Sequence, residues 1–396
     1  MKFLFFLIIL FPFFTLSQQN DAEYPKVKDK IEASLKDKNY KKSLKLTEKH
    51  LSKWPKDPFL NYAAAVSLFN SFSDKKIQKK FPDELTLWQK VIEFLTIGKA
   101  FEDKSNEKFQ LKVQKKLIQL ADKKYKADYN SAKAFYALFF NFFNLNEETV
   151  NQSAALVQLN YFEIGERKYF DGDTKQAFEI FDWLYLTFFN KEYSYVLDII
   201  SLIGDRDSEY DEWRHPKYYL SHTARKIESL SEHEQLVVAV HNLVRMNSQL
   251  FEKTFLNTFI KTHSGFSNEN SYVKSLREDL KKSAVRKLML PHELLIKAAK
   301  YHASDTKNPD KGHFSSDGRS FGERIREFGV KGKVGESISF SYTEADEIVI
   351  NLLIDKGVES LGHRKSILER GFVTIGTSIH THLKYEWICV INYSDQ

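Results

Sequence analysis

Apolar residues recur at spacings of three and four along the first half of the chain, from about residue 26 to residue 225. Few prolines or glycines interrupt this pattern, which is typical of amphipathic helices. Leu44 and Leu51 lead to Trp54 and Pro55, and a proline ends a helix, so we expect a helix pair broken at this point. The aromatic stretch over residues 135–143 is interpreted as a buried helix, and a concave, aromatic-lined groove that binds a peptide is the alternative. The first half is therefore predicted to be all-α.

A second helix pair is expected around residues 161–184. Tyr169-Phe170 precedes the turn-forming segment Asp171-Gly172-Asp173, and Ala177 opens a new apolar helix face. This arrangement resembles degenerate tetratricopeptide repeats, which stack helix pairs into a solenoid and commonly bind a protein partner. The repeats cannot be phased between Pro82 and Asn146. We therefore assign residues 24–230 to a helical-repeat (TPR-like) domain that recruits a protein partner.

The pattern changes after a charged, turn-rich stretch at residues 204–209. Ser231 followed three residues later by Glu234 forms a capping box, which predicts the start of a helix. The last apolar run, Trp387 to Tyr393, predicts a closing strand with Cys389 buried in it. We place a domain boundary near Ser231, so that residues 231–396 form a second domain.

The N-terminus carries Lys2, an apolar run from Phe3 to Phe14 and small residues up to Ser17. This is the pattern of a secretory signal peptide, which we assign to residues 1–17; an uncleaved anchor is the alternative. Cys389 is the only cysteine, so no internal disulfide can form. Together these features predict a secreted or envelope protein. Secreted animal proteins of this size commonly contain disulfides, so their absence favours a bacterial protein.

The net charge of +6 comes from 59 basic and 53 acidic residues that are mixed along the chain. A diffuse excess of this kind lacks the basic stripe of a nucleic-acid reader, so we predict no nucleic-acid partner. A membrane surface stays open as a partner. The first half also has no nucleotide-binding loop or metal-ligand spacing, which leaves the chemistry to the second half.

Candidate chemistry is concentrated near the C-terminus in four residues: His313, Glu336, Asp355 and His363. Imidazoles and carboxylates are the groups that bind divalent cations or transfer protons near neutral pH. Glycines precede three of them and allow the backbone to turn tightly. The residues alone leave open what chemistry these side chains perform.

The second domain resembles the CAP superfamily, the cysteine-rich secretory, antigen 5 and pathogenesis-related-1 proteins, in a disulfide-free bacterial form. The resemblance rests on six segments in the family's order, with a charged insertion at about residues 269–287: residues 241–245, 298–305, 312–318, 335–338, 353–364 and 372–376. It implies a three-layer α-β-α sandwich with a mostly antiparallel sheet and a cleft that holds the four polar residues. The fold class is thus multidomain, an all-α repeat domain followed by an α+β domain.

Three positions depart from the family's pattern, and one of them is Leu352, which lies where an aromatic residue is common. Asp355 stands where many relatives have glutamate, which shortens the carboxylate by one methylene, and Ser337 replaces a common asparagine. The shorter side chain of Asp355 could change the geometry of the site, whereas the fold depends on it less. Arg324 and Arg364 are expected to face solvent or to pair with nearby acids, and His302 to be an ordinary, partly buried histidine.

The resemblance favours an extracellular binding module over an enzyme. His313 and His363 would ligate Zn²⁺ or Mg²⁺, with the two acids as ligands or as partners that orient the rings, and a lipid or another small molecule is an alternative ligand. A metal-assisted or histidine-based hydrolase is a second possibility, but Ser315, Ser316 and Ser360 are nucleophile candidates by proximity alone. A structural adhesion protein, in which the four residues only satisfy buried hydrogen bonds, is a third.

Overall fold

The computed structural model describes residues 22–143, 148–188, 208–305, 312–368 and 371–396. The chain divides into two compact units, residues 1–154 and 155–396, and the division falls within helix α8 (Glu148–Phe170). The predicted signal segment lies outside the described residues, and the predicted boundary near Ser231 stays a prediction. Within the described ranges, no helix combines the length and the apolar character needed to cross a membrane.

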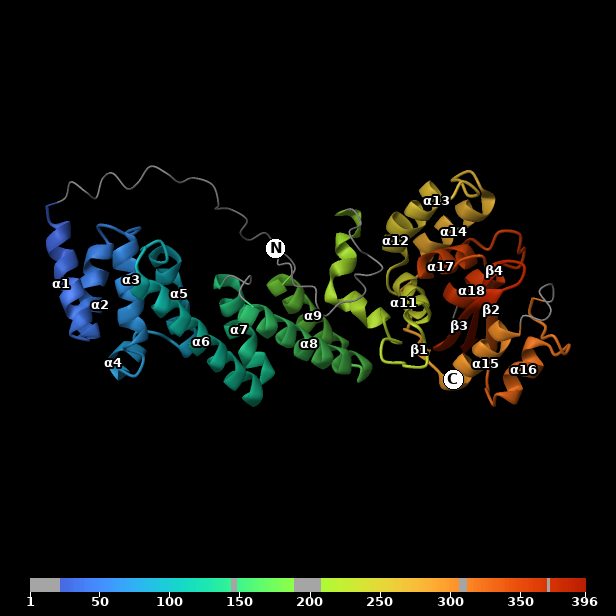
Figure 1. Ribbon diagram of the computed structural model, residues 1–396, viewed down its shortest axis with the longest axis horizontal. Coiled ribbons are helices and arrows are strands. Elements are labelled where there is room, and N and C mark those ends of the chain that lie inside the picture. Colours follow the sequence, from blue (N-terminus) through green and yellow to red (C-terminus); the bar gives the residue numbers. More distant parts are fainter. Residues whose placement is uncertain (1–21, 144–147, 189–207, 306–311, 369–370) are drawn as a thin grey trace. The chain divides into compact units, whose positions relative to one another are not determined.

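The first unit is built from helices (Figure 1), and all but the first of them begin at an aspartate or asparagine cap. Asp57, Asp83, Asp103 and Asp128 each accept a hydrogen bond from a backbone N–H of the helix that follows, which satisfies a donor that has no partner within the helix. The helices are α1 (Tyr24–Lys36), α2 (Tyr40–Leu51), α3 (Pro58–Phe69), α4 (Lys75–Gln78), α5 (Glu84–Gly98), α6 (Lys104–Ala127) and α7 (Tyr129–Phe142).

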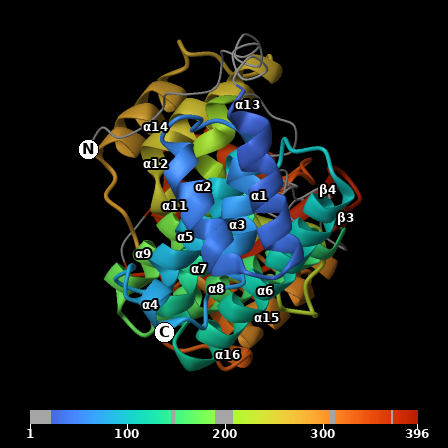
Figure 2. The same ribbon diagram turned by 90° about the vertical axis from the view of Figure 1, so that its left-hand side faces the viewer.

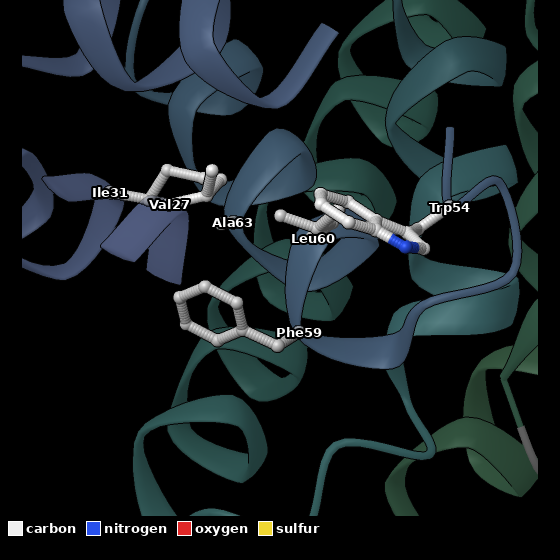
Figure 3. Packing of buried hydrophobic residues seen from close by; sticks show 6 residues of the cluster. All are labelled: Val27, Ile31, Trp54, Phe59, Leu60 and Ala63. Atoms are coloured by element: carbon white, nitrogen blue, oxygen red, sulfur yellow. The ribbon is translucent and has the colours of Figure 1, made fainter. Parts of the chain in front are cut away.

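A hydrophobic cluster joins α1 to α3, which lie side by side with α2 in Figure 2. The members of this cluster are Val27, Ile31, Trp54, Phe59, Leu60 and Ala63 (Figure 3). Trp54 and Pro55 lie in the connection between α2, which ends at Leu51, and α3, so the predicted break at this proline is confirmed. The aromatic stretch of α7 is buried, as predicted, with Phe139 and Phe140 almost fully covered.

Helix α8 and helix α9 (Thr174–Phe188) are joined by the turn at Gly172, whose φ of 90° requires a residue without a Cβ. This is the helix pair expected from the sequence. The all-α character of the N-terminal half is therefore confirmed for the described residues, whereas the tetratricopeptide-like repeat stays a prediction. Two 3₁₀ helices follow, η1 (Ser208–Arg214) and η2 (Pro216–Ser221).

The C-terminal part of the second unit begins with α11 (Glu232–Met246), and the capping box between Ser231 and Glu234 is present as predicted. The helices that follow α11 are α12 (Ser248–Phe251), the π-helical turn η3 (Glu252–Leu256), α13 (Asn257–Thr262), α14 (Ser271–Lys282), α15 (Glu293–Ser304), α16 (Phe321–Glu327), α17 (Ala345–Ile354) and α18 (Gly362–Leu368).

The sheet of this part has four strands in the order β1-β3-β4-β2. Strand β4 pairs antiparallel with both β2 and β3, and the short β1 is parallel to β3, so the predicted mostly antiparallel sheet is confirmed. Cys389 is fully buried in it, as predicted. The strands are β1 (Leu290–Pro291), β2 (Val334–Phe340), β3 (Thr374–His382) and β4 (Glu386–Ser394).

Helices cover both faces of the sheet (Figure 1). On one face α15 packs Ala299 and Ala303 against Ile338 and Val390. It approaches β3 so closely that a Cβ at Gly376 would overlap the α15 backbone. On the other face, α11 places His241 Nε2 3.0 Å from the Tyr393 hydroxyl of β4. The three-layer α-β-α sandwich is therefore confirmed.

Candidate functional site

The first histidine of the site, His313, follows a turn that α15 holds in place. Gly312 has a φ of 50°, and its carbonyl lies 2.8 Å from Nε2 of His302. His302 is buried, and burial lowers its pKa below the ordinary value, which favours a neutral ring. It was expected to be an ordinary histidine, but it also fixes the residue before His313.

The ring of His313 contacts Glu336 on β2. Its Nδ1 is 2.9 Å from Glu336 Oε1, and the side chains are 49% and 1% exposed respectively. Arg324 of α16 is also 1% exposed and pairs with the other oxygen, Glu336 Oε2, at 2.5 Å. It further donates to the His313 carbonyl and to Ser315 Oγ. This first arm is therefore a row of imidazole, carboxylate and guanidinium, of which only the imidazole reaches solvent.

Asn392 also faces Glu336 from the neighbouring strand, where the two residues are opposite in register. With the amide oriented to satisfy both of its ends, its nitrogen donates to Glu336 Oε2 over 3.2 Å and its oxygen accepts from Ala299 N–H. Sequence reasoning missed this residue, because the only signal for it is the strand pairing.

The second arm joins His363 to Asp355, which ends α17 with the left-handed φ of 58°. Asp355 Oδ1 is 2.8 Å from His363 Nδ1, while Oδ2 accepts the backbone N–H groups of His363 and Arg364 at 3.0 and 3.3 Å. The carboxylate is fully buried. Its shorter side chain therefore still reaches the ring, because the left-handed turn brings the α17 terminus close to the start of α18.

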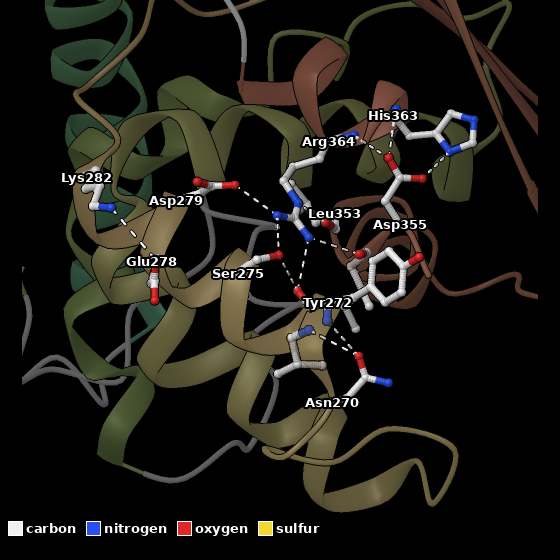
Figure 4. A network of polar contacts seen from close by, with 12 residues as sticks. Asn270, Tyr272, Ser275, Glu278, Asp279, Lys282, Leu353, Asp355, His363 and Arg364 are labelled. Atoms are coloured by element: carbon white, nitrogen blue, oxygen red, sulfur yellow. Dashed lines mark hydrogen bonds and ion pairs between the residues drawn. The ribbon is translucent and has the colours of Figure 1, made fainter. Parts of the chain in front are cut away.

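Arg364 anchors this arm to α14, the helix formed by the predicted charged insertion (Figure 4). Its side chain is 2% exposed, and all five of its N–H donors have acceptors. The acceptors are the carbonyls of Tyr272, Leu353 and Ile354, Ser275 Oγ and Asp279 Oδ2. Of the two alternatives expected for Arg324 and Arg364, pairing with nearby acids is confirmed. Neither side chain faces solvent.

The four predicted residues lie together, because the two rings approach each other. The centroids of His313 and His363 are 6.2 Å apart, and the ring planes are tilted by 40°. A carboxylate can only accept, so each Nδ1 carries the proton of the neutral ring and each Nε2 keeps its lone pair. The site therefore presents two imidazole nitrogens for binding, with the acids behind them.

A divalent cation fits this donor set only through the imidazoles. Zn–N bonds of about 2.0–2.1 Å at tetrahedral angles place the centroids of two rings on one cation roughly 5 Å apart. The observed spacing of 6.2 Å therefore requires the half-exposed His313 ring to move closer to His363 before both rings can ligate one cation. The two acids are engaged with the Nδ1 atoms, as partners of ligating histidines often are. No group of three or more His, Cys, Asp or Glu side chains is arranged around one metal position in the described part of the chain. Water or a bound ligand would therefore complete the coordination.

The same geometry offers little to nucleophilic catalysis. Ser315 is fully buried, and its hydroxyl accepts from Arg324. Ser316 and Ser360 are exposed. Across the described residues, no serine, threonine or cysteine side chain is hydrogen-bonded to His313 or His363, although an activated nucleophile would lie within hydrogen-bond reach of its base.

Residues 238–393 match the family model described as CAP, cysteine-rich secretory protein family. The chain carries a C-terminal CAP domain. The match begins within α11 and ends within β4, so it includes both arms of the site. Proteins of this family are often secreted. Searches of curated proteins and of solved structures found no match to the chain.

Proposed function

We propose that the CAP domain is an extracellular binding module that holds a divalent cation between His313 and His363. The observation that carries this proposal is that each imidazole is held at Nδ1 by a buried carboxylate, while the two rings lie 6.2 Å apart. Ligation through the two Nε2 atoms leaves other positions on the cation for water or a ligand. Such a site suits exchangeable binding better than a structural role.

The residues of the site act as ligands or as supports in this proposal. A bound cation would supply positive charge that attracts an anionic group of a partner or small molecule. Glu336 and Asp355 set the tautomer of each ring and strengthen its Nε2 as a ligand. His302 and Arg364 hold the backbone on either side. Export of the chain, predicted from the apolar run at residues 3–14, belongs to the same proposal.

Calorimetric titration with Zn²⁺ and Mg²⁺ tests this function. We expect wild-type protein to bind one Zn²⁺ and a His313→Ala, His363→Ala double variant to lose this binding. The matched control is a His233→Ala, His380→Ala double variant, which removes two exposed imidazoles from the same domain. Absence of binding in the wild type, or equal loss in both double variants, would refute the cation site. Retention of the fold is checked by circular dichroism.

A further inference from the structure

The basic residues of the first unit are all lysines. Between residues 22 and 154 the sequence has 26 lysines and 17 acidic residues but no arginine, and the first arginine of the chain is Arg167. This excess is larger than the net charge of the whole chain. Lysines and acids alternate along the sequence, so the excess becomes a surface feature only where a helix gathers the lysines on one side.

Helix α6 does so. It buries Phe109, Val113, Leu117 and Ala121 on its inner side. At 3.6 residues per turn, seven exposed lysines occupy an arc of about 120° over a helix length of about 33 Å. We call this set the α6 lysine face, and its members are Lys104, Lys108, Lys112, Lys115, Lys116, Lys123 and Lys126.

The lysines of this face have no acidic partners among the residues that the structure describes. In the described part of the chain none of the seven forms an ion pair, whereas Lys124, which lies outside the arc, pairs with Glu84. Lys112 contacts the Asn70 side chain and the ring of Phe69. The one acid within the arc, Asp122, accepts a hydrogen bond from the Tyr136 hydroxyl. The face therefore keeps a strong positive potential.

An apolar residue borders these lysines. Leu111 is 49% exposed and lies about 20° beyond one edge of the arc, one turn from Lys108 and from Lys115. Lysine side chains combine an apolar stem with a charged end, so they can lie around an apolar contact while the ammonium groups reach anionic groups. A lysine-rich helix side bordered by an exposed leucine suits the headgroup region of a bilayer, where lysines meet anionic groups.

We propose that the α6 lysine face binds the surface of a bilayer that contains anionic lipids. Charge complementarity carries this choice, because lysines near such a surface each contribute attraction within a Debye length. The lysines lie along one side of a helix, so all of them can approach the flat, negatively charged surface of a bilayer at once. Nucleic-acid recognition would instead use arginine forks for bases and phosphates, and aromatic platforms in a groove, and the exposed side of α6 has neither.

Vesicle sedimentation of the full chain tests this proposal. The probes are vesicles of phosphatidylcholine alone and of phosphatidylcholine with phosphatidylglycerol, each at low and high salt. The test variant replaces Lys104, Lys108, Lys115 and Lys126 by Gln, which keeps the helix propensity. The control replaces Lys30, Lys36, Lys45 and Lys49 of α1 and α2 by Gln. These lysines are also exposed and form no ion pair with the described residues, so the two variants change the net charge equally.

We expect binding to anionic vesicles that salt weakens and that the α6 variant reduces on the order of a hundred-fold or more. The control variant should lose about ten-fold or less, because net charge acts more weakly than local contact. Any binding to neutral vesicles should be the same for the wild type and both variants, because it does not depend on lysine charge. The proposal is overturned by absence of anionic-vesicle binding, by equal losses in both variants, by full competition from inorganic phosphate at constant ionic strength, or by binding of single-stranded RNA in place of vesicles.

Discussion

Glu336 and Asp355 each hold one imidazole at its Nδ1, yet their negative charges are balanced by different groups. Glu336 lies on a strand and pairs with the buried guanidinium of Arg324. Asp355 lies at a helix end and accepts two backbone N–H groups from the first turn of α18. The first arm therefore depends on one charged side chain, and the second depends on backbone geometry. We expect substitutions to affect the two arms unequally.

The largest effect is expected from Arg324→Met. This change leaves Glu336 buried without its cation, and breaking a buried ion pair costs about 3–5 kcal/mol of unfolding free energy. Chemical denaturation measures the loss. The double variant Arg324→Met, Glu336→Gln should recover part of it, because no charge is left unpaired. A double variant as unstable as the single one would show that Arg324 acts through packing instead.

The pH dependence of stability tests the packing of α11 on the sheet that carries the first arm. There Tyr393 lies opposite Gly335, the residue before Glu336, and contacts His241 of α11. Burial lowers the pKa of His241 to about 4. Between about pH 4 and pH 6.5 the unfolded state, with a histidine pKa near 6.5, binds a proton that the folded state does not. The contribution of His241 to the free energy of unfolding is therefore fully present above about pH 6.5. It should fall by roughly 3 kcal/mol as the pH drops from about 6.5 to about 4.

Urea unfolding across this pH range, compared between wild type and His241→Gln, isolates that contribution. Glutamine does not titrate, so the variant should show a shallower dependence. Some slope will remain from His222, whose pKa burial also lowers to about 4. Identical slopes in the two proteins would mean that His241 does not titrate as its burial requires.

Cation affinity should separate the arms with less effect on folding. Asp355→Asn keeps an oxygen that accepts from His363, and asparagine tolerates the left-handed conformation. Loss of the negative charge behind a ligating histidine typically weakens metal binding 10- to 100-fold, so we expect about a ten-fold loss in Zn²⁺ titrations. Asp355→Glu, which restores the common length, should gain no affinity. A clear gain would mean that the shorter aspartate limits the site.

The smallest effect is expected at the outer end of the second arm. Asp279 is 48% exposed, so Asp279→Asn should lower stability by about 0.5–1 kcal/mol, as exposed ion pairs do. Glu278→Gln is the matched control on α14, since its partner Lys282 is also exposed, and it should change thermal stability less. Equal shifts in melting temperature for both variants would exclude a special role for the Arg364 contact.

The sequence was sufficient to place the four polar residues and the sandwich, because the order of short segments around them is specific. The two arginines show where sequence reasoning ends. Arg364 is buried by contacts with Ser275 and Asp279, which lie 89 and 85 positions away in the sequence. No local pattern marks such a residue as buried. The charged insertion likewise gave no sign that α14 buries Val273, Leu276 and Leu280.

Backbone conformation was the second limit. The sequence shows an aspartate in place of a glutamate, and only the left-handed turn at Asp355 explains why the shorter side chain suffices. In the first unit, the boundaries of α6 decide which lysines share a side. The repeats could not be phased there from the sequence, so the alternation of charges along the chain concealed the α6 lysine face.

The five filled donors of Arg364 limit how the CAP domain can be modified. Helix α14 cannot be deleted without loss, because it supplies one carbonyl and two side-chain acceptors to the guanidinium of Arg364. Shortening residues 269–287 to a loop would leave these donors buried without acceptors. The position of Arg364, and with it the position of the neighbouring His363, would then change. The insertion and the second histidine are therefore expected to be inherited, transplanted or redesigned as a single module.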